Sequence, residues 1–183
     1  SAIECERAII VATHGRGIYI ADIAPLAEVT ADVLAKDAYF FQPESKVRWI
    51  AQDIGNWASD NFAGDSEPLA IPFYYYLKDG MSGEVTFTVY QGNVAIAEMT
   101  GTAEAGLHKI NWPMSKMEER SEAQQEQMRE RMARFGRPVT EDEIRYTNTP
   151  APIGEYAIVM SVNGIEIKRK ASILKDEWWL DRR

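Results

Sequence analysis

A histidine and an arginine in a glycine-rich turn are the first residues of this sequence whose types suit chemistry. His14 and Arg16 alternate with Gly15 and Gly17, and this short segment separates two apolar runs. An imidazole can transfer protons near neutral pH, and a guanidinium can hold an anion. Glycines at these positions equally suit a tight turn, in which the same side chains bond loop carbonyls. We favour the turn and expect no catalytic residue in this chain.

Carboxylates that could bind a cation or cleave a glycoside lie in a long loop over residues 52–68. Asp60, Asp65 and Glu67 carry the oxygen ligands that calcium prefers. Paired carboxylates are also the groups that hydrolyse glycosidic bonds. Their spacing matches no EF-hand loop, and acidic loops are usually only solvated. We therefore expect no cofactor, with calcium at these three residues as the alternative.

Aromatic rings in or beside the same loop could bind a carbohydrate, because the faces of sugars stack on exposed rings. Trp57 and Phe62 lie in the loop, and Trp49 precedes it. Rings in a β-rich chain more often fill the core. In the run over residues 71–77, alternate residues face opposite sides of a strand, and at least one set must be buried. Carbohydrate binding is therefore the alternative function.

Other catalytic and metal centres find little support in the sequence. The two histidines, His14 and His108, are far apart, so a histidine-rich zinc site is not expected. His108 alternates onto the same strand face as Ile110 and Trp112, which predicts a half-buried ring with a hydrogen-bond partner. No Gly-x-Ser-x-Gly motif occurs, and the single Cys5 has no partner for a disulfide or a cysteine-based metal site.

Charge and hydropathy disfavour two classes of partner. Among 183 residues, 28 acidic side chains outnumber 20 basic ones, and the formal net charge is −8. This field repels phosphate backbones, so we expect no nucleic-acid partner. No stretch approaches the roughly 20 apolar residues of a membrane-spanning helix, so we expect no membrane span. The chain begins at Ser1 without a signal-type leader, which favours a processed chain or a fragment.

Short strands with alternating side chains dominate the sequence from residue 38 onward. In residues 84–91, Val85, Phe87 and Val89 fall on one face, and polar residues occupy the other. Gly92-Asn93 and Asn163-Gly164 suit two-residue hairpin turns. Eight such strands favour a β-sandwich. They are expected over residues 38–42, 46–50, 70–77, 84–91, 94–100, 107–112, 154–162 and 165–174.

A helical insertion interrupts the strands at about residues 113–152. Ser115 and Glu118 form a capping-box pattern, which predicts a helix from there to Gly136, and Thr140 with Glu143 predicts a second, shorter one. Met128, Met132 and Phe135 form a narrow apolar stripe. We expect this stripe to dock on the sandwich, with a partner surface as the alternative.

The N-terminal segment predicts two strands, over residues 8–13 and 18–21, about the glycine-rich turn. A connector over residues 22–36 follows, with Pro25 near the start of a short helix. An isolated two-stranded hairpin is marginally stable in water. These strands are therefore expected to pair with the sandwich or with a second copy of the chain as a homodimer.

The N-terminal segment resembles the end of the propeller in bacterial sortilin-like, BNR-repeat, glycosyl-hydrolase-like proteins. The resemblance is carried by Val11-Ala12-Thr13-His14-Gly15-Arg16-Gly17-Ile18-Tyr19-Ile20 and by Asp22-Ile23-Ala24-Pro25-Leu26. Proteins of this family continue into a sandwich similar to the immunoglobulin-like domain of flagellar hook-capping proteins. Weaker landmarks for that domain lie at residues 72–77, 106–112 and 153–156. The Ser-x-Asp-x-Gly box of BNR blades is absent, and the insertion is longer than usual.

The resemblance implies two parts. Residues 1–35 would be a remnant of the last propeller blade with its connector, and residues 36–183 an immunoglobulin-like antiparallel β-sandwich. His14, Gly15, Arg16 and Gly17 would form the propeller-junction motif. The chain would be a non-catalytic C-terminal structural or interaction module, and its partners the upstream propeller and a glycan or protein. A catalytic centre of a parent glycosyl hydrolase would lie upstream. The family also implies export, to the periplasm or cell surface of a bacterium.

Overall fold

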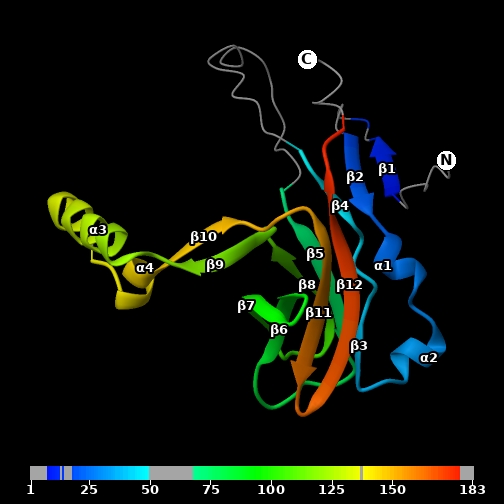
Figure 1. Ribbon diagram of the computed structural model, residues 1–183. Helices are drawn as coiled ribbons and strands as arrows, with labels where there is room; N and C mark the ends of the chain where they lie inside the picture. Colours follow the sequence, from blue (N-terminus) through cyan, green and yellow to red (C-terminus); the bar gives the residue numbers. More distant parts are fainter. Residues whose placement is uncertain (1–7, 13, 15–17, 50–67, 137, 178–183) are drawn as a thin grey trace.

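The computed structural model describes residues 8–12, 14, 18–49, 68–136 and 138–177 and is mainly β (Figure 1). The strands are β1 Ala8–Ala12, β2 Ile18–Asp22, β3 Ala38–Phe40, β4 Lys46–Arg48, β5 Ile71–Leu77, β6 Val85–Gln91, β7 Val94–Gly101, β8 Gly106–Trp112, β9 Ser115–Glu119, β10 Tyr146–Pro150, β11 Gly154–Val162 and β12 Ile165–Lys175. The helices are α1 Ala24–Ala27, α2 Ala31–Leu34, α3 Glu122–Phe135 and α4 Glu141–Arg145. The eight predicted strands correspond to β3–β8, β11 and β12.

Two sheets share one buried core. The larger sheet has the strand order β4-β12-β11-β6-β7, and the smaller has the order β3-β5-β8. Phe87 of the larger sheet packs on Phe40, Phe73 and Tyr75 of the smaller, with ring centroids 5.4, 5.8 and 5.1 Å away. All neighbours pair antiparallel except β4 and β12, which run parallel, so the larger sheet is mixed where an antiparallel one was predicted.

Side-chain alternation in the central strands follows the sequence pattern. Val85, Phe87 and Val89 of β6 are fully buried, as predicted. In β5 the buried set includes Phe73 and Tyr75, while the residues between them are half-buried. The aromatic residues of β5 that the sequence left ambiguous are thus divided by the pleat into a core set and an outer set.

Both predicted hairpin turns are confirmed by their backbone angles. Asn163 and Gly164 have φ values of 46° and 78°, as the type I′ turn between β11 and β12 requires. Gly92 has a φ of 61° at the first central position of the turn between β6 and β7. These turns set the register of the two longest hairpins in the larger sheet.

The insertion begins with a strand, and the predicted start of its helix is wrong. Ser115 belongs to β9, which pairs antiparallel with β10. Helix α3 begins six residues later, at a capping box that Ser121 forms with Gln124. The sequence carries this capping pattern twice in succession, and pairing with a strand almost thirty residues away decides between the two. The helix ends at Gly136, and the Thr140–Glu143 capping box opens α4, both as predicted.

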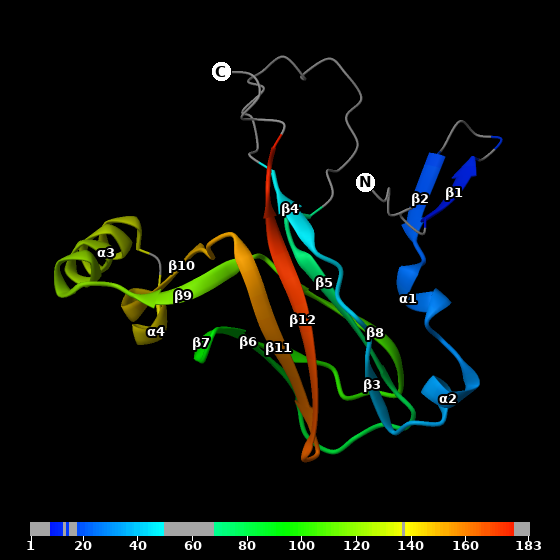
Figure 2. The same cartoon turned by 45° about the vertical axis from the view of Figure 1, so that its right-hand side comes forward.

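The ribbon of β9 and β10 carries α3 away from the two sheets (Figures 1 and 2). No residue of α3 is buried, and Phe135 is 72% exposed. The expectation that the apolar stripe docks on the sheets is therefore wrong. The ribbon extends outward before the helix begins, so the stripe is carried beyond reach of the core.

The N-terminal hairpin is confirmed, with α1 and α2 as its connector. Strands β1 and β2 pair antiparallel with each other and form a sheet of their own. In the part of the chain that the structure describes, no other strand joins them. Pairing of the hairpin with the two larger sheets, one of the two expected outcomes, is not observed.

Candidate functional site

Most of the predicted site residues lie outside the described part of the chain. Residues 50–67 include the predicted carbohydrate-binding residues Trp57 and Phe62 and the predicted calcium ligands Asp60, Asp65 and Glu67. Both hypotheses therefore remain predictions at these residues. Of the junction motif, Gly15, Arg16 and Gly17 are likewise undescribed. His14 is described and is exposed between β1 and β2. Trp49 is described at the end of β4.

Within the described ranges, no group of three or more His, Cys, Asp and Glu side chains is arranged to hold a metal ion. No described helix is long and apolar enough to cross a membrane. His108 is half-buried, as predicted, with its Nε2 atom 2.8 Å from the carbonyl oxygen of Glu104 and its ring 5.3 Å from that of Tyr75. Its surroundings are those of a structural histidine.

The β1–β2 hairpin presents apolar side chains to solvent on both of its faces. Ile9, Ile10 and Val11 are consecutive, so they alternate between the two faces, and all three are exposed. Tyr19, the partner of Val11 across the ribbon, is exposed as well. Interaction surfaces are typically rich in exposed apolar side chains of this kind.

A small hollow of about 220 Å³ lies around Trp49, whose side chain is 38% exposed. Leu69 and Met114 contribute apolar atoms to it, and Ser45 and Lys46 contribute polar ones. Arg48, on β4, donates a 2.8 Å hydrogen bond to the carbonyl of Met114 and so ties β4 to the segment before β9. The hollow thus places a partly exposed indole beside polar groups.

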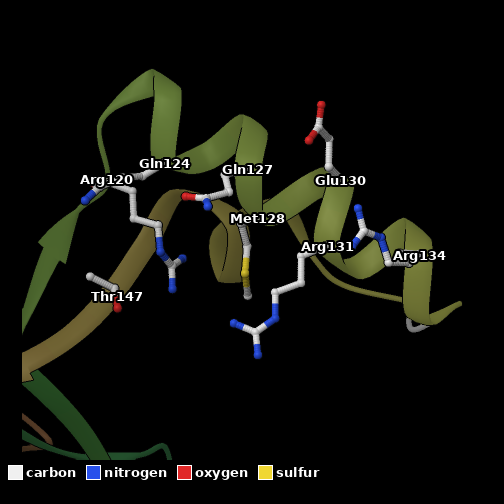
Figure 3. Close-up of a pocket in the computed structure, with 8 residues that line it drawn as sticks. All are labelled: Arg120, Gln124, Gln127, Met128, Glu130, Arg131, Arg134 and Thr147. Carbon is white, nitrogen blue, oxygen red and sulfur yellow. The ribbon is translucent and has the colours of Figure 1, made fainter.

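A larger hollow, of about 500 Å³, lies between α3 and β10 (Figure 3). The sequence analysis did not identify it. Its lining is rich in arginine, with one acidic residue and one methionine, and consists of Arg120, Gln124, Gln127, Met128, Glu130, Arg131, Arg134 and Thr147. Arginines three residues apart on one helix face were the available signal, but the opposite wall comes from a strand that was not predicted.

Arg120 lies between β9 and α3 and links this connection to the segment that joins α4 and β10. Its Nη1 donates to the carbonyls of Glu143, Ile144 and Tyr146, at the junction of α4 and β10. A charged donor shared among three carbonyls is stronger than neutral hydrogen bonds. This contact fixes one wall of the hollow.

Ion pairs on the ribbon shift two pKa values. The pKa of Glu118 is lowered, chiefly because its carboxylate bonds the ammonium of Lys116 on the same strand. The pKa of Arg145 is raised, chiefly by its 2.7 Å bond to the carboxylate of Glu119. The Arg145–Glu119 pair is exposed and the Lys116–Glu118 pair is partly exposed, so solvent screens both and they stabilise the protein weakly.

No protein-family model matches the chain, and a search of curated proteins finds no significant match.

Proposed function

We propose that this chain is a structural and interaction module, in which an immunoglobulin-like β-sandwich carries a hairpin that completes the sheet of a neighbouring β-propeller. The observation that carries this proposal is the β1–β2 hairpin, a separate sheet with apolar side chains exposed on both faces. Two strands alone are marginal in water, and open edges favour pairing with further strands. Full burial of one isoleucine side chain stabilises by roughly 1.5–3 kcal/mol.

Strand order supports the immunoglobulin-like part of the proposal. The strand order β12-β11-β6 in the larger sheet matches strands G, F and C of that fold. The order β3-β5-β8 in the smaller sheet matches strands A, B and E. Tyr156 stands near the start of β11 and donates a hydrogen bond to the carbonyl of Pro152, four residues upstream. This is the arrangement of a tyrosine corner. Tyr156 also packs on buried Trp112, with ring centroids 5.1 Å apart.

The resemblance of the junction motif supports the identity of the partner domain. A propeller blade is a four-stranded sheet, so a hairpin that supplies two strands of the last blade would pair through an open edge with the other strands of that blade, and the propeller would cover its exposed apolar side chains. In this proposal the chain supplies no chemistry of its own, and a catalytic centre would belong to the propeller. Export to the periplasm or cell surface follows from the same resemblance, and fractionation of the source cells tests it.

Hydrogen–deuterium exchange on the chain alone and on a longer polypeptide that includes the proposed propeller tests the hairpin's role. We expect the amides of β1 and β2 to exchange rapidly in the chain alone and to be protected at least about tenfold in the longer polypeptide. The amides of β6 and β11 should exchange slowly in both. Equal exchange of the hairpin in both samples would refute the proposal.

A matched pair of substitutions gives a second readout. Ile10 and Val94 are strand residues of similar exposure, 68% and 66%, but only Ile10 lies on the hairpin. Ile10→Ser should lower the melting temperature of the longer polypeptide and leave that of the chain alone unchanged. Val94→Ser should change neither. An Ile10→Ser effect confined to the chain alone would mean that the hairpin packs within this chain.

Carbohydrate binding is a second candidate function, favoured by the partly exposed Trp49 in its hollow. Affinity electrophoresis through polysaccharide gels tests it. Retardation that is abolished by Trp49→Ala or by Trp57→Ala would support a sugar site at this end of the chain. Mobility that no polysaccharide alters would eliminate it.

A further inference from the structure

Helix α3 is ordered without a core of its own. It has 14 residues, none of which is buried. Isolated helices of this length are marginal in water. The capping box at Ser121 and the left-handed Gly136 satisfy its two ends. Arg129 bonds Glu126 on the same helix and Glu141 at the start of α4, in exposed ion pairs. These contacts hold the helix in place but leave its inner face open.

This inner face of α3 lines the 500 Å³ hollow, and β10 lies on the opposite side. Met128 points into this space between the side chains of Arg120 and Arg131, with Thr147 of β10 nearby (Figure 3). The hollow therefore combines an apolar floor with guanidinium groups at its sides. A methionine in such a position adapts to partners of varied shape.

Two arginines of the hollow have no acidic partner among the residues that the structure describes. Arg131 and Arg134 form no ion pair with any residue that the structure describes, whereas Arg129 and Arg145 are paired. Arg134 lies in the last turn of α3, where the helix dipole favours a cation, but Arg131 lies outside that turn. Glu130 is the one acidic residue among those lining the hollow. The surface is thus locally basic on a chain whose net charge is −8.

We propose that this hollow binds an acidic segment of a partner polypeptide. Carboxylates of the segment would pair with Arg131 and Arg134, and an apolar side chain beside them would rest on Met128. Guanidinium groups bind carboxylates in a planar, two-bonded geometry, which favours arginine over lysine here. A simple inorganic anion would leave Met128 unused. Nucleic acid and anionic membranes carry a denser and more extended negative charge than a short acidic segment, so the net charge of −8 disfavours them more strongly.

Fluorescence anisotropy with two labelled peptides tests this site. In one peptide, pairs of glutamates alternate with leucine, and in the other, pairs of lysines alternate with leucine. We expect saturable binding of the glutamate peptide, weakened as salt rises because the contacts are exposed. The lysine peptide should not bind. Preferential binding of the lysine peptide, or no binding of either, would overturn the proposal.

Two charge reversals provide the matched control. Arg131→Glu should weaken binding of the glutamate peptide by about tenfold or more. Lys78→Glu makes the same change in net charge at an exposed residue just after β5, outside the lining of the hollow, and it should alter the dissociation constant by less than about twofold. Far-UV circular dichroism establishes that both variants keep the helix. Equal weakening by both variants would show that net charge, not the hollow, controls binding.

Met128→Ser tests the apolar contact. It should lower the affinity for the glutamate–leucine peptide severalfold. The affinity for a peptide of glutamate alone, which is weaker in the natural chain, should not change. Competition by inorganic phosphate at concentrations that leave the ionic strength unchanged would show a simple anion site and overturn the proposal. Tighter binding to phosphatidylserine vesicles or to DNA than to the glutamate peptide would do the same.

Discussion

Gly101, at the end of β7, has no room for a methyl group. A Cβ atom at this position would lie 2.5 Å from Oη of Tyr75, 3.0 Å from its Cζ and 3.3 Å from Cε2 of Phe87. Both neighbours are core residues. Tyr75 is held in place because its hydroxyl donates a 2.9 Å hydrogen bond to the carbonyl of Thr102. Gly101→Ala must therefore displace a ring that the core and a hydrogen bond both fix.

The expected cost follows from these contacts. Overpacking a core by one methyl group costs about 1–3 kcal/mol, and loss of the tyrosine hydrogen bond adds about 1 kcal/mol. The φ angle of Gly101 lies outside the left-handed region, so alanine adds no backbone strain, and its lower entropy when unfolded offsets about 0.5 kcal/mol. We expect Gly101→Ala to lower the free energy of unfolding by about 2–3 kcal/mol.

A double-mutant cycle with Tyr75→Phe isolates the contact. Tyr75→Phe alone should cost about 1 kcal/mol through the lost hydrogen bond, but it removes the atom that the new methyl group would strike. In the phenylalanine background, Gly101→Ala should therefore cost about 1 kcal/mol less than in the natural chain. Urea unfolding followed by tryptophan fluorescence and by circular dichroism measures all four proteins.

Gly80→Ala is the control. Its Cβ would meet nothing nearer than the carbonyl of Ala103 at 3.9 Å, and its φ is also outside the left-handed region. It should alter stability by less than about 0.5 kcal/mol. A neutral Gly101→Ala, or costs that simply add in the cycle, would show that the hydroxyl of Tyr75 does not lie against Gly101 and that β5 and β7 are packed differently.

Three further outcomes are expected. Phe87→Ala should cost about 3–5 kcal/mol in urea unfolding, and Thr88→Ala, on the outer face, less than about 1 kcal/mol; equal losses would contradict the alternation of β6. Gly164→Ala should lower the melting temperature, because alanine at a φ of 78° is strained by about 1–2 kcal/mol, and an unchanged melting temperature would exclude the type I′ turn. The folded pKa of Glu118 lies below its ordinary value of 4.5, so its stabilising pair with Lys116 is present above that pH and is lost as the pH falls through the folded pKa. Glu118→Gln should therefore destabilise at pH 7 and have no effect in strong acid, as denaturant titrations at several pH values can show.

The positions of the strands in the two larger sheets were predictable because their signals are local, whereas β9 and β10 were not predicted. The alternation of Val85, Phe87 and Val89 identifies a strand and its buried face without reference to any other segment. The turn at Asn163-Gly164 is equally local, since its backbone angles exclude most other residues. For such elements the folded structure adds partners but does not change the assignment.

The start of α3 was mispredicted because two capping patterns compete. Ser115 with Glu118 and Ser121 with Gln124 are similar as sequence. In the structure the first lies in β9, whose pairing with β10 satisfies backbone groups that a helix would otherwise satisfy. A ladder between strands so far apart in sequence leaves no mark in either segment alone.

The candidate sites also differ in whether local sequence or contacts between distant segments create them. Trp49 could be selected from its residue type, and the structure places it in a hollow. The spacing of Arg131 and Arg134 was visible, but the hollow itself could not be anticipated, because Arg120 between β9 and α3, and Thr147 on β10, complete it from segments far apart in the chain. The apolar stripe of α3 was visible, but the direction in which it points depends on the ribbon beneath it.

Residue order thus accounts for the mainly β character of this chain, the inner face of each central strand and the geometry of its tight turns, because steric limits and side-chain periodicity act over a few residues. The folded arrangement alone decides which strands become neighbours, that the hairpin of β1 and β2 stands apart, and that α3 is held away from the core, where Arg131 and Arg134 form no ion pair with any described residue. Those features depend on contacts between distant segments, whose energies no local pattern encodes.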